Sequence, residues 1–263
     1  MDISSLFGVK GKIIVVSGGS RGLGKMISTG FVTNGAKVYI ASRDYKACLN
    51  TAAELNSLGA GKCIPIQADF SNDEGIASFA SKILQLEPAG IDVLINNAGV
   101  NWAEEIDTHP ISEFENIISV NVTGVFFLSQ KLIPALEKRG TAENPSRIIN
   151  IGSIAGLAIT KKKSFSYNAS KAAIHHMSRA MALALAEKNI TVNNVAPGFF
   201  DTLMMAKALE ADRDGVVRSA PLNRLGRPTD IAAVCIYLAS PGSAYLTGST
   251  IKVDGGTTIK SKI

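Results

Sequence analysis

Short runs of β-branched and apolar residues alternate along the chain with longer segments in which apolar residues recur every three or four positions. The short runs predict buried strands, and the longer segments predict amphipathic helices. Alternation of this kind is typical of a parallel sheet whose successive strands are joined by helices. The expected strands are Lys12–Ser17, Lys37–Ser42, Lys62–Ala68, Ile91–Asn96, Arg147–Ser153, Thr191–Ala196 and Ser249–Val253.

The helical segments complete the alternation, and several of them begin with Ser, Thr or Asp at cap-like positions. They are expected over Gly22–Asn34, Tyr45–Leu58, Asp73–Leu86, Ser112–Lys138, Ser166–Lys188 and Thr229–Ala239. Because the strands are apolar on both faces, helices should cover both faces of the sheet. The sequence therefore predicts an α/β fold, a Rossmann-like, doubly wound, about seven-stranded parallel sheet that binds its ligand at the carboxyl ends of the strands.

Composition supports one soluble domain spanning residues 1–263, with 46% hydrophobic and 19% charged residues and no linker-like tract. No uninterrupted apolar run approaches the ~20 residues of a membrane span, so we expect no membrane segment. The net charge of +5 comes from dispersed basic residues, which argues against nucleic acid as a partner. The amino terminus has no secretory pattern, and an intracellular location is expected.

The residue types that bind metals or form disulfides follow no recognisable pattern. The chain has three Cys and three His residues, and none of them lies at metal-ligand or CxxC spacing. We expect neither a metal site nor a disulfide, and we expect the thiols to be buried. The residues concerned are Cys48, Cys63, Cys235, His109, His175 and His176.

The first expected strand runs directly into a glycine-rich turn, Ser17-Gly18-Gly19-Ser20-Arg21-Gly22-Leu23-Gly24, and then into a helix. This strand–turn–helix context is the one that a dinucleotide-binding loop requires. Gly18 can make the tight turn, Gly22 lets backbone N–H groups approach a pyrophosphate, and Gly24 allows close packing of helix and strand. The sequence therefore predicts a nicotinamide dinucleotide cofactor.

The end of the second expected strand bears on which cofactor is used. NAD enzymes place a carboxylate there to bind the ribose 2′-hydroxyl, whereas this strand ends with Ser42 and Arg43. Arg43 and Arg21 could instead bind a 2′-phosphate through their guanidinium groups. NADPH is therefore favoured, and Asp44, one residue further on, is the nearby carboxylate that would favour NAD instead.

Tyr167 and Lys171 are four residues apart in an expected helix, so both side chains lie on one helix face. A cation beside a phenol stabilises the phenolate, which helps the phenol to protonate an alkoxide at neutral pH. Ser153, at the expected end of a strand, would lie at the same edge of the sheet and could bind the substrate oxygen. The three residues together indicate reduction of a ketone.

These motifs occur in the order typical of one family over nearly the whole chain, which resembles the short-chain dehydrogenases/reductases. Within that family the chain is most similar to 3-oxoacyl-thioester reductases, particularly the rhamnolipid type, and to yeast carbonyl reductases. The TGxxxGxG motif of the family appears at 17–24 with Ser in place of Thr. The remaining motifs match Asp69, the segment Asn96-Asn97-Ala98-Gly99, Asn121, Ser153, the pair Tyr167 and Lys171, and Pro197-Gly198 with Thr202.

The resemblance implies hydride transfer from the nicotinamide to a carbonyl carbon. Tyr167 would donate the proton, Ser153 would polarise the carbonyl, Asn121 would help to hold a water relay to Lys171, and Lys171 would also contact the ribose. Substrate specificity would lie in a loop near 199–218, and related proteins form homotetramers. The implied cofactor contacts are Gly18, Ser20, Arg21, Gly22, Leu23, Gly24, Ser42, Arg43, Asp69, Asn97, Ala98, Gly99, Tyr167, Lys171, Pro197, Gly198 and Thr202.

Several residues have two interpretations of equal weight. Asn96 and Asn97 could bind the cofactor or simply tie strands together, and Met204 and Met205 could form a substrate lid or helix core. The lysines at 161–163 could attract a phosphate-bearing thioester, although a solvated loop is the simpler interpretation.

Two other functions remain open. A polyol or sugar-alcohol dehydrogenase would share the catalytic residues, and a non-catalytic NADPH-binding sensor would share the fold. A dienoyl-CoA reductase is disfavoured because Tyr167 is present. The chain ends in Ser261-Lys262-Ile263, close to the Ser-Lys-Leu peroxisomal signal, so a cytoplasmic and a peroxisomal location both remain possible.

Overall fold

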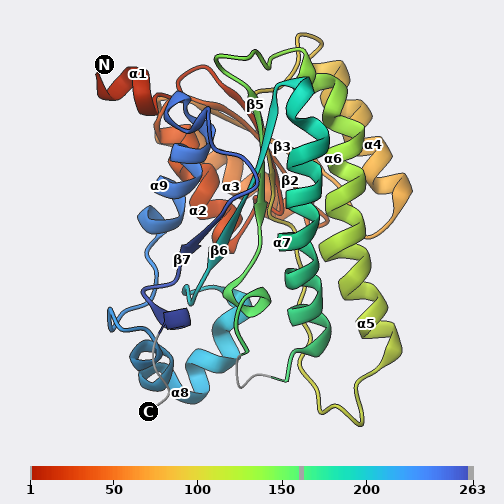
Figure 1. Ribbon diagram of the computed structural model, residues 1–263, viewed down its shortest axis with the longest axis vertical. Coiled ribbons are helices and arrows are strands. Elements are labelled where there is room, and N and C mark those ends of the chain that lie inside the picture. The colour runs from red at the N-terminus through yellow and green to blue at the C-terminus, as the bar shows by residue number, and fades with distance from the viewer. Residues whose placement is uncertain (1, 160–162, 260–263) are drawn as a thin grey trace.

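The computed structural model describes residues 2–159 and 163–259, so the predictions that concern Lys161, Lys162 and Ser261–Ile263 lie outside the described residues. Its strands form one seven-stranded sheet in the order β3-β2-β1-β4-β5-β6-β7, and all neighbouring pairs are parallel (Figure 1). The predicted α/β fold is confirmed. The strands are β1 (Ile13–Ser17), β2 (Lys37–Ser42), β3 (Lys62–Gln67), β4 (Val93–Asn96), β5 (Ser146–Ile151), β6 (Ile190–Pro197) and β7 (Thr250–Val253).

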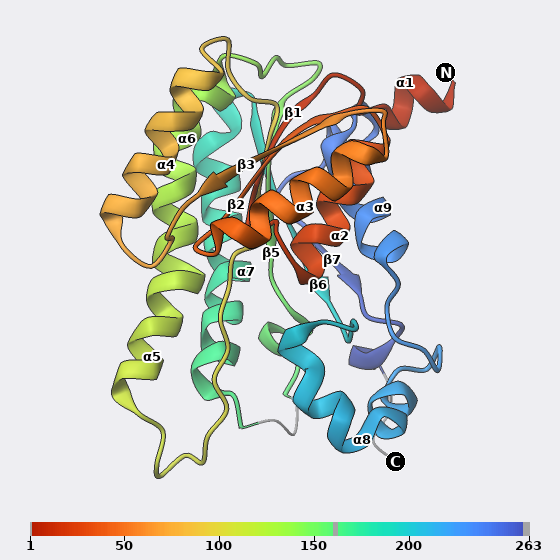
Figure 2. The ribbon, with the colours of Figure 1, turned by 180° about the vertical axis from the view of Figure 1, so that it is seen from behind.

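Helices cover both faces of the sheet (Figures 1 and 2). Successive β1 side chains pack against opposite helix layers, with Ile14 and Val16 in one apolar cluster and Val15 in the opposite one. This two-sided burial is why the strands read as continuous apolar runs. One layer holds α2 (Gly22–Thr33), α3 (Tyr45–Ser57) and α9 (Pro228–Ala239), and the other holds α4 (Asp73–Leu86), α6 (Gly124–Glu137) and α7 (Phe165–Leu185).

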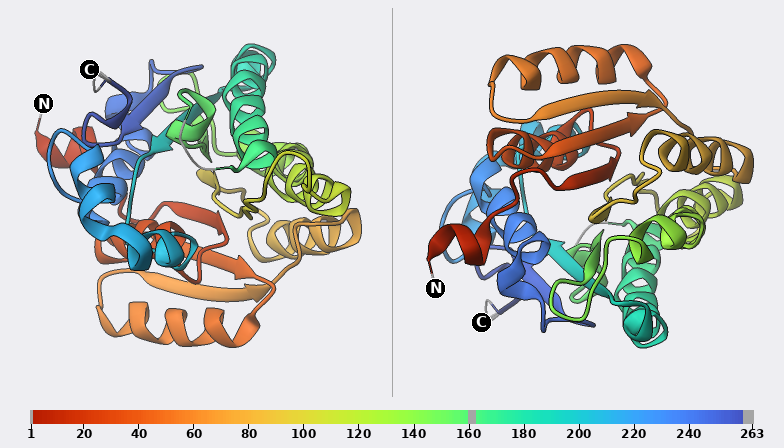
Figure 3. Two further views of the ribbon diagram at one scale, coloured as in Figure 1. Left: turned by 90° about the horizontal axis from the view of Figure 1, so that it is seen from below. Right: turned by 90° about the horizontal axis from the view of Figure 1, so that it is seen from above.

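The order of the strands reverses direction at β1, which lies between β2 and β4. The loops that follow β1 and β4 therefore diverge, and ligands of such sheets bind in the crevice between them. The Ser17 hydroxyl ties these two loops together, because its Oγ accepts hydrogen bonds from the Asn97 and Ala98 amides, both at 3.1 Å. Figure 3 (left) shows the molecule from this carboxyl end of the sheet.

The helix expected over Ser112–Lys138 is interrupted. It consists of α5 (Ile111–Ile118), a π-helical turn over Ser119–Thr123, and α6. A π-turn inserts a residue into the helix and is frequent at functional sites, and this one contains Asn121. Apolar periodicity does not reveal a single inserted residue.

The helical segment Ile111–Glu137 contains an 18-residue window with a mean hydropathy of 1.3, so by length and composition alone it meets the requirements of a membrane span. The sequence analysis considered only uninterrupted apolar runs and therefore did not identify this segment. In the fold its α6 part packs on the sheet beside α4 and α7, and Leu128, Leu132 and Leu136 enter the core.

Two helices were not expected. The region near 199–218 is not an open loop, because most of it forms α8 (Ala206–Ser219), which lies below the sheet in Figure 1 and buries only Leu209. Such a helix carries almost no core-facing stripe for a sequence to reveal. At the amino terminus, α1 (Ile3–Phe7) begins at Asp2, whose Oδ1 accepts from the Ser5 amide at 2.8 Å.

Candidate active site

A cavity of about 510 Å³ opens at the carboxyl ends of β1, β2, β4 and β5. It brings together most of the residues predicted to contact a cofactor, which come from segments far apart in the sequence. Those lining it are Gly18, Ser20, Arg21, Gly22, Leu23, Ser42, Arg43, Asp69, Asn97, Ala98, Gly99, Tyr167, Lys171 and Thr202.

The glycine-rich turn is shaped by close backbone contacts. Gly18 has a φ of +66°, and a Cβ there would lie 2.9 Å from the Ala98 Cα. A Cβ on Gly24 would lie 2.2 Å from the Gly18 carbonyl oxygen, so only glycine allows α2 to pack this closely. Gly24 therefore shapes the turn from behind and does not line the cavity.

The amino terminus of α2 points its unpaired amides toward the cavity, because Gly22 and Leu23 line it. The cap residue, Arg21, makes no side-chain cap hydrogen bond. Free amides and the positive end of the helix dipole form a suitable environment for a phosphate group. The residues present therefore fit a dinucleotide.

Arg21 and Arg43 are exposed side chains in the wall of the cavity. The carboxylate that could have favoured NAD has another role, since Asp44 Oδ1 caps α3 by accepting a hydrogen bond from the Ala47 amide at 2.9 Å. The charges at the end of β2 therefore suit an anionic group.

Asn96 and Asn97 both tie strands together. Asn96 is buried and donates to Ser129 Oγ and Asn150 Oδ1 at 2.9 and 2.8 Å. Asn97 donates to the Ser17 and Gly18 carbonyl oxygens, both at 3.0 Å, and also lines the cavity. Asp69 accepts from the Ser71 amide at 2.9 Å, which fixes the turn after β3.

Tyr167 and Lys171 lie on one face of α7, as the sequence predicted. Lys171 Nζ is 5.6 Å from the centroid of the Tyr167 ring and donates to the Ile151 carbonyl oxygen at 2.8 Å. Lys171 is only 5% exposed, and burial lowers the pKa of its ammonium group to about 8. The ammonium therefore remains charged at neutral pH.

Ser153 does not lie on a strand, which corrects the prediction. β5 ends at Ile151, and Ser153 begins a short 3₁₀ turn in which its Oγ accepts from the Ala155 amide at 3.1 Å. The hydroxyl hydrogen of Ser153 is donated to the Tyr167 oxygen, since a hydrogen bond donated to a phenol oxygen lowers the pKa of that phenol. Burial raises the pKa of Tyr167, and a hydrogen bond with Ser153 partly offsets that increase.

Asn121 is buried, and its side-chain amide makes three hydrogen bonds to other protein groups. Nδ2 donates to the Val100 carbonyl oxygen and to Ser170 Oγ, while Oδ1 accepts from the Val100 amide. Both amide hydrogens are taken, whereas Oδ1 can accept a second hydrogen bond, so the role of Asn121 in a water relay stays a prediction. The structure gives Asn121 the task of joining the loop after β4 to α7.

His175 was missed as a contributor to the site. Its Nε2 lies 2.9 Å from the Ser153 carbonyl oxygen, and because a carbonyl only accepts, Nε2 carries the hydrogen. A Cβ on Gly152 would lie 2.3 Å from the imidazole ring, so the glycine makes room for it. The signal available in the sequence was spacing, since His175 lies four residues after Lys171 on the same helix.

A smaller cavity of about 110 Å³ adjoins the first and shares Tyr167, Thr202 and Asn101 with it. Met204 lines both cavities and Met205 the smaller one, so both belong to the cavity walls rather than to a buried core. Asn101 and Ile151 were also missed by the sequence analysis. The smaller cavity further contains Ser153, Pro197 and Gly198 from the predicted set.

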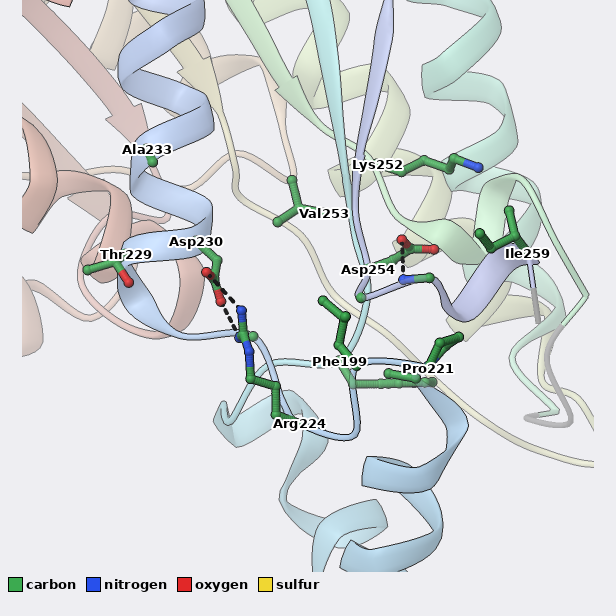
Figure 4. Close-up of a pocket in the computed structure, with 15 residues that line it drawn as sticks. Phe199, Pro221, Arg224, Thr229, Asp230, Ala233, Lys252, Val253, Asp254 and Ile259 are labelled. Carbon is green, nitrogen blue, oxygen red and sulfur yellow. Dashed lines mark hydrogen bonds and ion pairs between the residues drawn. The ribbon is translucent and has the colours of Figure 1, made fainter.

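A third cavity, of about 810 Å³, lies elsewhere and includes neither Tyr167 nor Lys171. Figure 4 shows it between the start of α9 and the end of β7, with the Arg224–Asp230 ion pair on one side and Asp254 on the other. Asp254 Oδ1 accepts from the Gly256 amide at 3.1 Å. These charged groups are already paired, so the cavity provides no catalytic set.

The described residues contain no group of three or more potential metal ligands. Burial raises the pKa of Cys63 and of Cys235 to about 12, and all three thiols are buried. None of the three cysteines lines either of the two adjoining cavities.

Residues 17–258 match the family model described as enoyl-(acyl carrier protein) reductase. The chain is 42% identical over 256 residues to a rhamnolipids biosynthesis 3-oxoacyl-[acyl-carrier-protein] reductase of Pseudomonas aeruginosa, covering 95% of this chain and 97% of that protein. It is 32% identical to a galactitol 2-dehydrogenase (L-tagatose-forming) of Cereibacter sphaeroides, over 98% of this chain and 100% of that one.

Among solved structures, the Pseudomonas aeruginosa RhlG/NADP active-site complex superimposes with a TM-score of 0.91 at 40% identity, covering 97% of this chain and 99% of that one. A short-chain type dehydrogenase/reductase from Mycobacterium marinum superimposes with a TM-score of 0.90 at 33% identity, covering 98% and 100%. The order of the motifs, the fold and these relatives agree, and the chain belongs to the short-chain dehydrogenase/reductase family.

Proposed function

We propose that this oxidoreductase uses NADPH to reduce a ketone, specifically a 3-oxoacyl thioester or a related 3-oxoester, to a secondary alcohol. The observation that carries the proposal is the convergence of Ser153, Tyr167 and Lys171 at the wall where the two cavities meet. The similarity to the 3-oxoacyl reductase of Pseudomonas aeruginosa and to the RhlG/NADP active-site complex from the same organism supports it.

When bound, NADPH supplies the hydride. Gly22 and Leu23 would bind its phosphates through their amides, and Arg21 and Arg43 its 2′-phosphate. Ser153 would donate its hydroxyl hydrogen to the substrate carbonyl oxygen when the substrate is bound, and so stabilise the negative charge that forms there. These contacts hold the ketone beside the Tyr167 hydroxyl.

Tyr167 is protonated at neutral pH because its pKa is raised by burial, and it can donate its hydrogen to the forming alkoxide. The Lys171 ammonium, 5.6 Å from the ring centroid, stabilises the phenolate that results. The bond from Lys171 Nζ to the Ile151 carbonyl oxygen keeps the ammonium in this position.

The direct test is the loss of NADPH absorbance with the N-acetylcysteamine thioester of 3-oxobutanoate and with ethyl 3-oxobutanoate. The proposal expects turnover that depends on the ketone, with NADPH preferred to NADH. Tight NADPH binding without turnover on any ketone of a broad panel would instead identify a cofactor sensor.

A polyol or sugar-alcohol dehydrogenase is the second candidate, and the galactitol 2-dehydrogenase among the relatives favours it. The catalytic residues would be the same, so only substrate preference separates the two functions. Oxidation of galactitol that is faster than reduction of either 3-oxo compound would establish this alternative.

A further inference from the structure

Thr51 carries the one hydroxyl group in the buried stripe of α3, which it shares with Cys48, Ala52 and Leu55. Its side chain is only 5% exposed. Threonine hydroxyls inside a helix commonly donate to the carbonyl one turn earlier, as that of Thr29 does in α2. The Thr51 hydroxyl makes a different bond, because it donates to a group outside its own helix.

The acceptor of this bond is the backbone carbonyl oxygen of Ser20, at 2.8 Å, in the glycine-rich turn 31 residues earlier in the chain. The peptide bond between Ser20 and Arg21 is trans, so its N–H points away from its C=O. Since α3 holds the carbonyl, the Arg21 amide faces away from α3. This amide makes no backbone hydrogen bond to another described residue, so it is available to a ligand.

The same part of the turn lies beside the end of β2. Ser20 Oγ donates to Ser42 Oγ at 3.0 Å, and both serines line the 510 Å³ cavity together with Arg21 and Arg43. The end of the second strand is where a fold of this type recognises the 2′ substituent of the adenosine ribose. The Arg21 amide and the Ser20 hydroxyl are therefore two donors beside the expected position of the 2′-phosphate.

We propose that Thr51 is a positioning residue for cofactor choice, which fixes the peptide between Ser20 and Arg21 so that its N–H and the Ser20 hydroxyl can bind the 2′-phosphate of NADPH. The inference rests on the proposed function. Thr51 does not line the cavity, so it acts through the turn and not by contact with the cofactor. Hydrogen bonds to a charged acceptor are about twice as strong as those to a neutral one, so Thr51 should matter more for NADPH than for NADH.

The first experiment measures ligand binding to Thr51→Val, which preserves the shape of the side chain and removes its hydrogen-bond donor. The two ligands are adenosine 2′,5′-bisphosphate and adenosine 5′-monophosphate, which differ only in the 2′-phosphate, and calorimetry gives their dissociation constants. We expect the constant for the bisphosphate to rise about fivefold and that for the monophosphate to change by less than about twofold. Neither ligand carries a nicotinamide, so the result does not depend on turnover.

The second experiment measures the ratio of kcat/KM with NADPH to that with NADH. The ratio should fall about fivefold in Thr51→Val, chiefly through KM for NADPH, and Thr51→Ser, which returns the hydroxyl, should restore most of it. Thr29→Val is the matched control, because it removes a hydroxyl whose bond stays within its own helix, and it should leave the ratio unchanged. Thr51→Ala removes the same donor with a smaller side chain and should reproduce the fall if the valine variant does not fold.

Equal losses of affinity for the bisphosphate and the monophosphate would show that Thr51 only supports the turn, and would overturn the inference. Unchanged binding of both ligands would overturn it as well. Failure of the proposed function gives a different result, in which no ketone is reduced while the bisphosphate still distinguishes Thr51→Val from the wild type. A wild-type protein that binds the bisphosphate no more tightly than the monophosphate would reject both the 2′-phosphate site and the role of Thr51.

Discussion

At the scale of single residues, the phenol of Tyr167 is the group on which reduction depends. Tyr167→Phe removes the transferable hydrogen and preserves the ring that packs against Lys171. We expect turnover on the best ketone to fall about 100-fold or more, the usual effect of losing a general acid, with NADPH affinity unchanged. Stopped assays for turnover and cofactor fluorescence for binding measure the two separately.

Lys171→Ala is the informative comparison for that variant, because it should lower both turnover and NADPH affinity. A Tyr167→Phe protein that retains more than about one-tenth of wild-type turnover would show that another group supplies the proton. Ser153, whose hydroxyl forms a hydrogen bond with Tyr167, would then be the candidate.

The pH dependence of reduction should follow Lys171. Its pKa is lowered to about 8 because the ammonium group is buried, so it is charged below that pH and neutral above it. Tyr167, whose pKa is raised, keeps its hydrogen throughout this range. We expect kcat/KM for ketone reduction to be constant near neutral pH and to decline as pH rises through about 8, and a rate that instead increases there would contradict the assignment.

Cofactor preference should depend on Arg43, which lines the cavity at the end of β2. Arg43→Ala should reduce the ratio of kcat/KM with NADPH to that with NADH by about tenfold, through the loss of one charge-assisted contact at an exposed position. Lys46→Ala, an exposed cation three residues away that does not line the cavity, is the matched control. A wild-type ratio near or below unity would rule out the preference for NADPH itself.

At the scale of elements, α7 supplies Tyr167 and Lys171 and also holds the segment that carries Ser153. His175 makes that connection by donating to the Ser153 carbonyl oxygen while its ring occupies the space left by Gly152. His175 is thus a positioning residue. His175→Leu should lower kcat about tenfold through the loss of one buried hydrogen bond, with little change in NADPH affinity.

His175→Gln offers a donor at a similar distance and should restore most of the lost kcat. Rescue by glutamine distinguishes positioning of Ser153 from a general packing role, because leucine and glutamine have similar volumes. Equal kcat values for the two variants would leave the hydrogen bond without a role in catalysis. Thermal unfolding of both variants provides the accompanying measure of stability.

At the scale of the whole molecule, we propose that the chain forms a homotetramer through α5, α6 and α7. Phe114, Phe126 and Phe127 are 41%, 39% and 38% exposed in the isolated chain, and Leu183 on α7 is 83% exposed. Exposed aromatic side chains grouped on neighbouring helices are typical of an interface between subunits. Closed two-fold symmetry would bury this surface in each copy.

Light scattering at micromolar concentration should give a mass about four times the 27.6 kDa of one chain. Phe127→Asp should shift the mass toward smaller species, because it places a charge in the buried interface. Tyr245→Asp, at a fully exposed position outside these helices, serves as the control. A wild-type mass equal to that of one chain would reject the tetramer.

The sequence by itself determined the parallel α/β sheet, the dinucleotide turn and the pair Tyr167 and Lys171. These follow from local rules, because strand and helix periods, glycine at a positive φ and four-residue spacing in a helix are all fixed by nearby residues. The sequence analysis did not predict helix α8, because the helix buries only Leu209. It did not predict the π-turn, because apolar periodicity tolerates one inserted residue.

Only the tertiary structure determined which hydrogen-bond donors and acceptors of each polar group in the site are already paired within the protein. The sequence motif indicates a catalytic role for Asn121, yet both of its amide hydrogens are donated to Val100 and Ser170. In the sequence, His175 resembles an ordinary core residue, yet its Nε2 donates to the Ser153 carbonyl oxygen and holds that segment in place. Hydrogen-bond partners and burial depend on residues distant in sequence that the sheet brings together, so spacing along the chain cannot assign them.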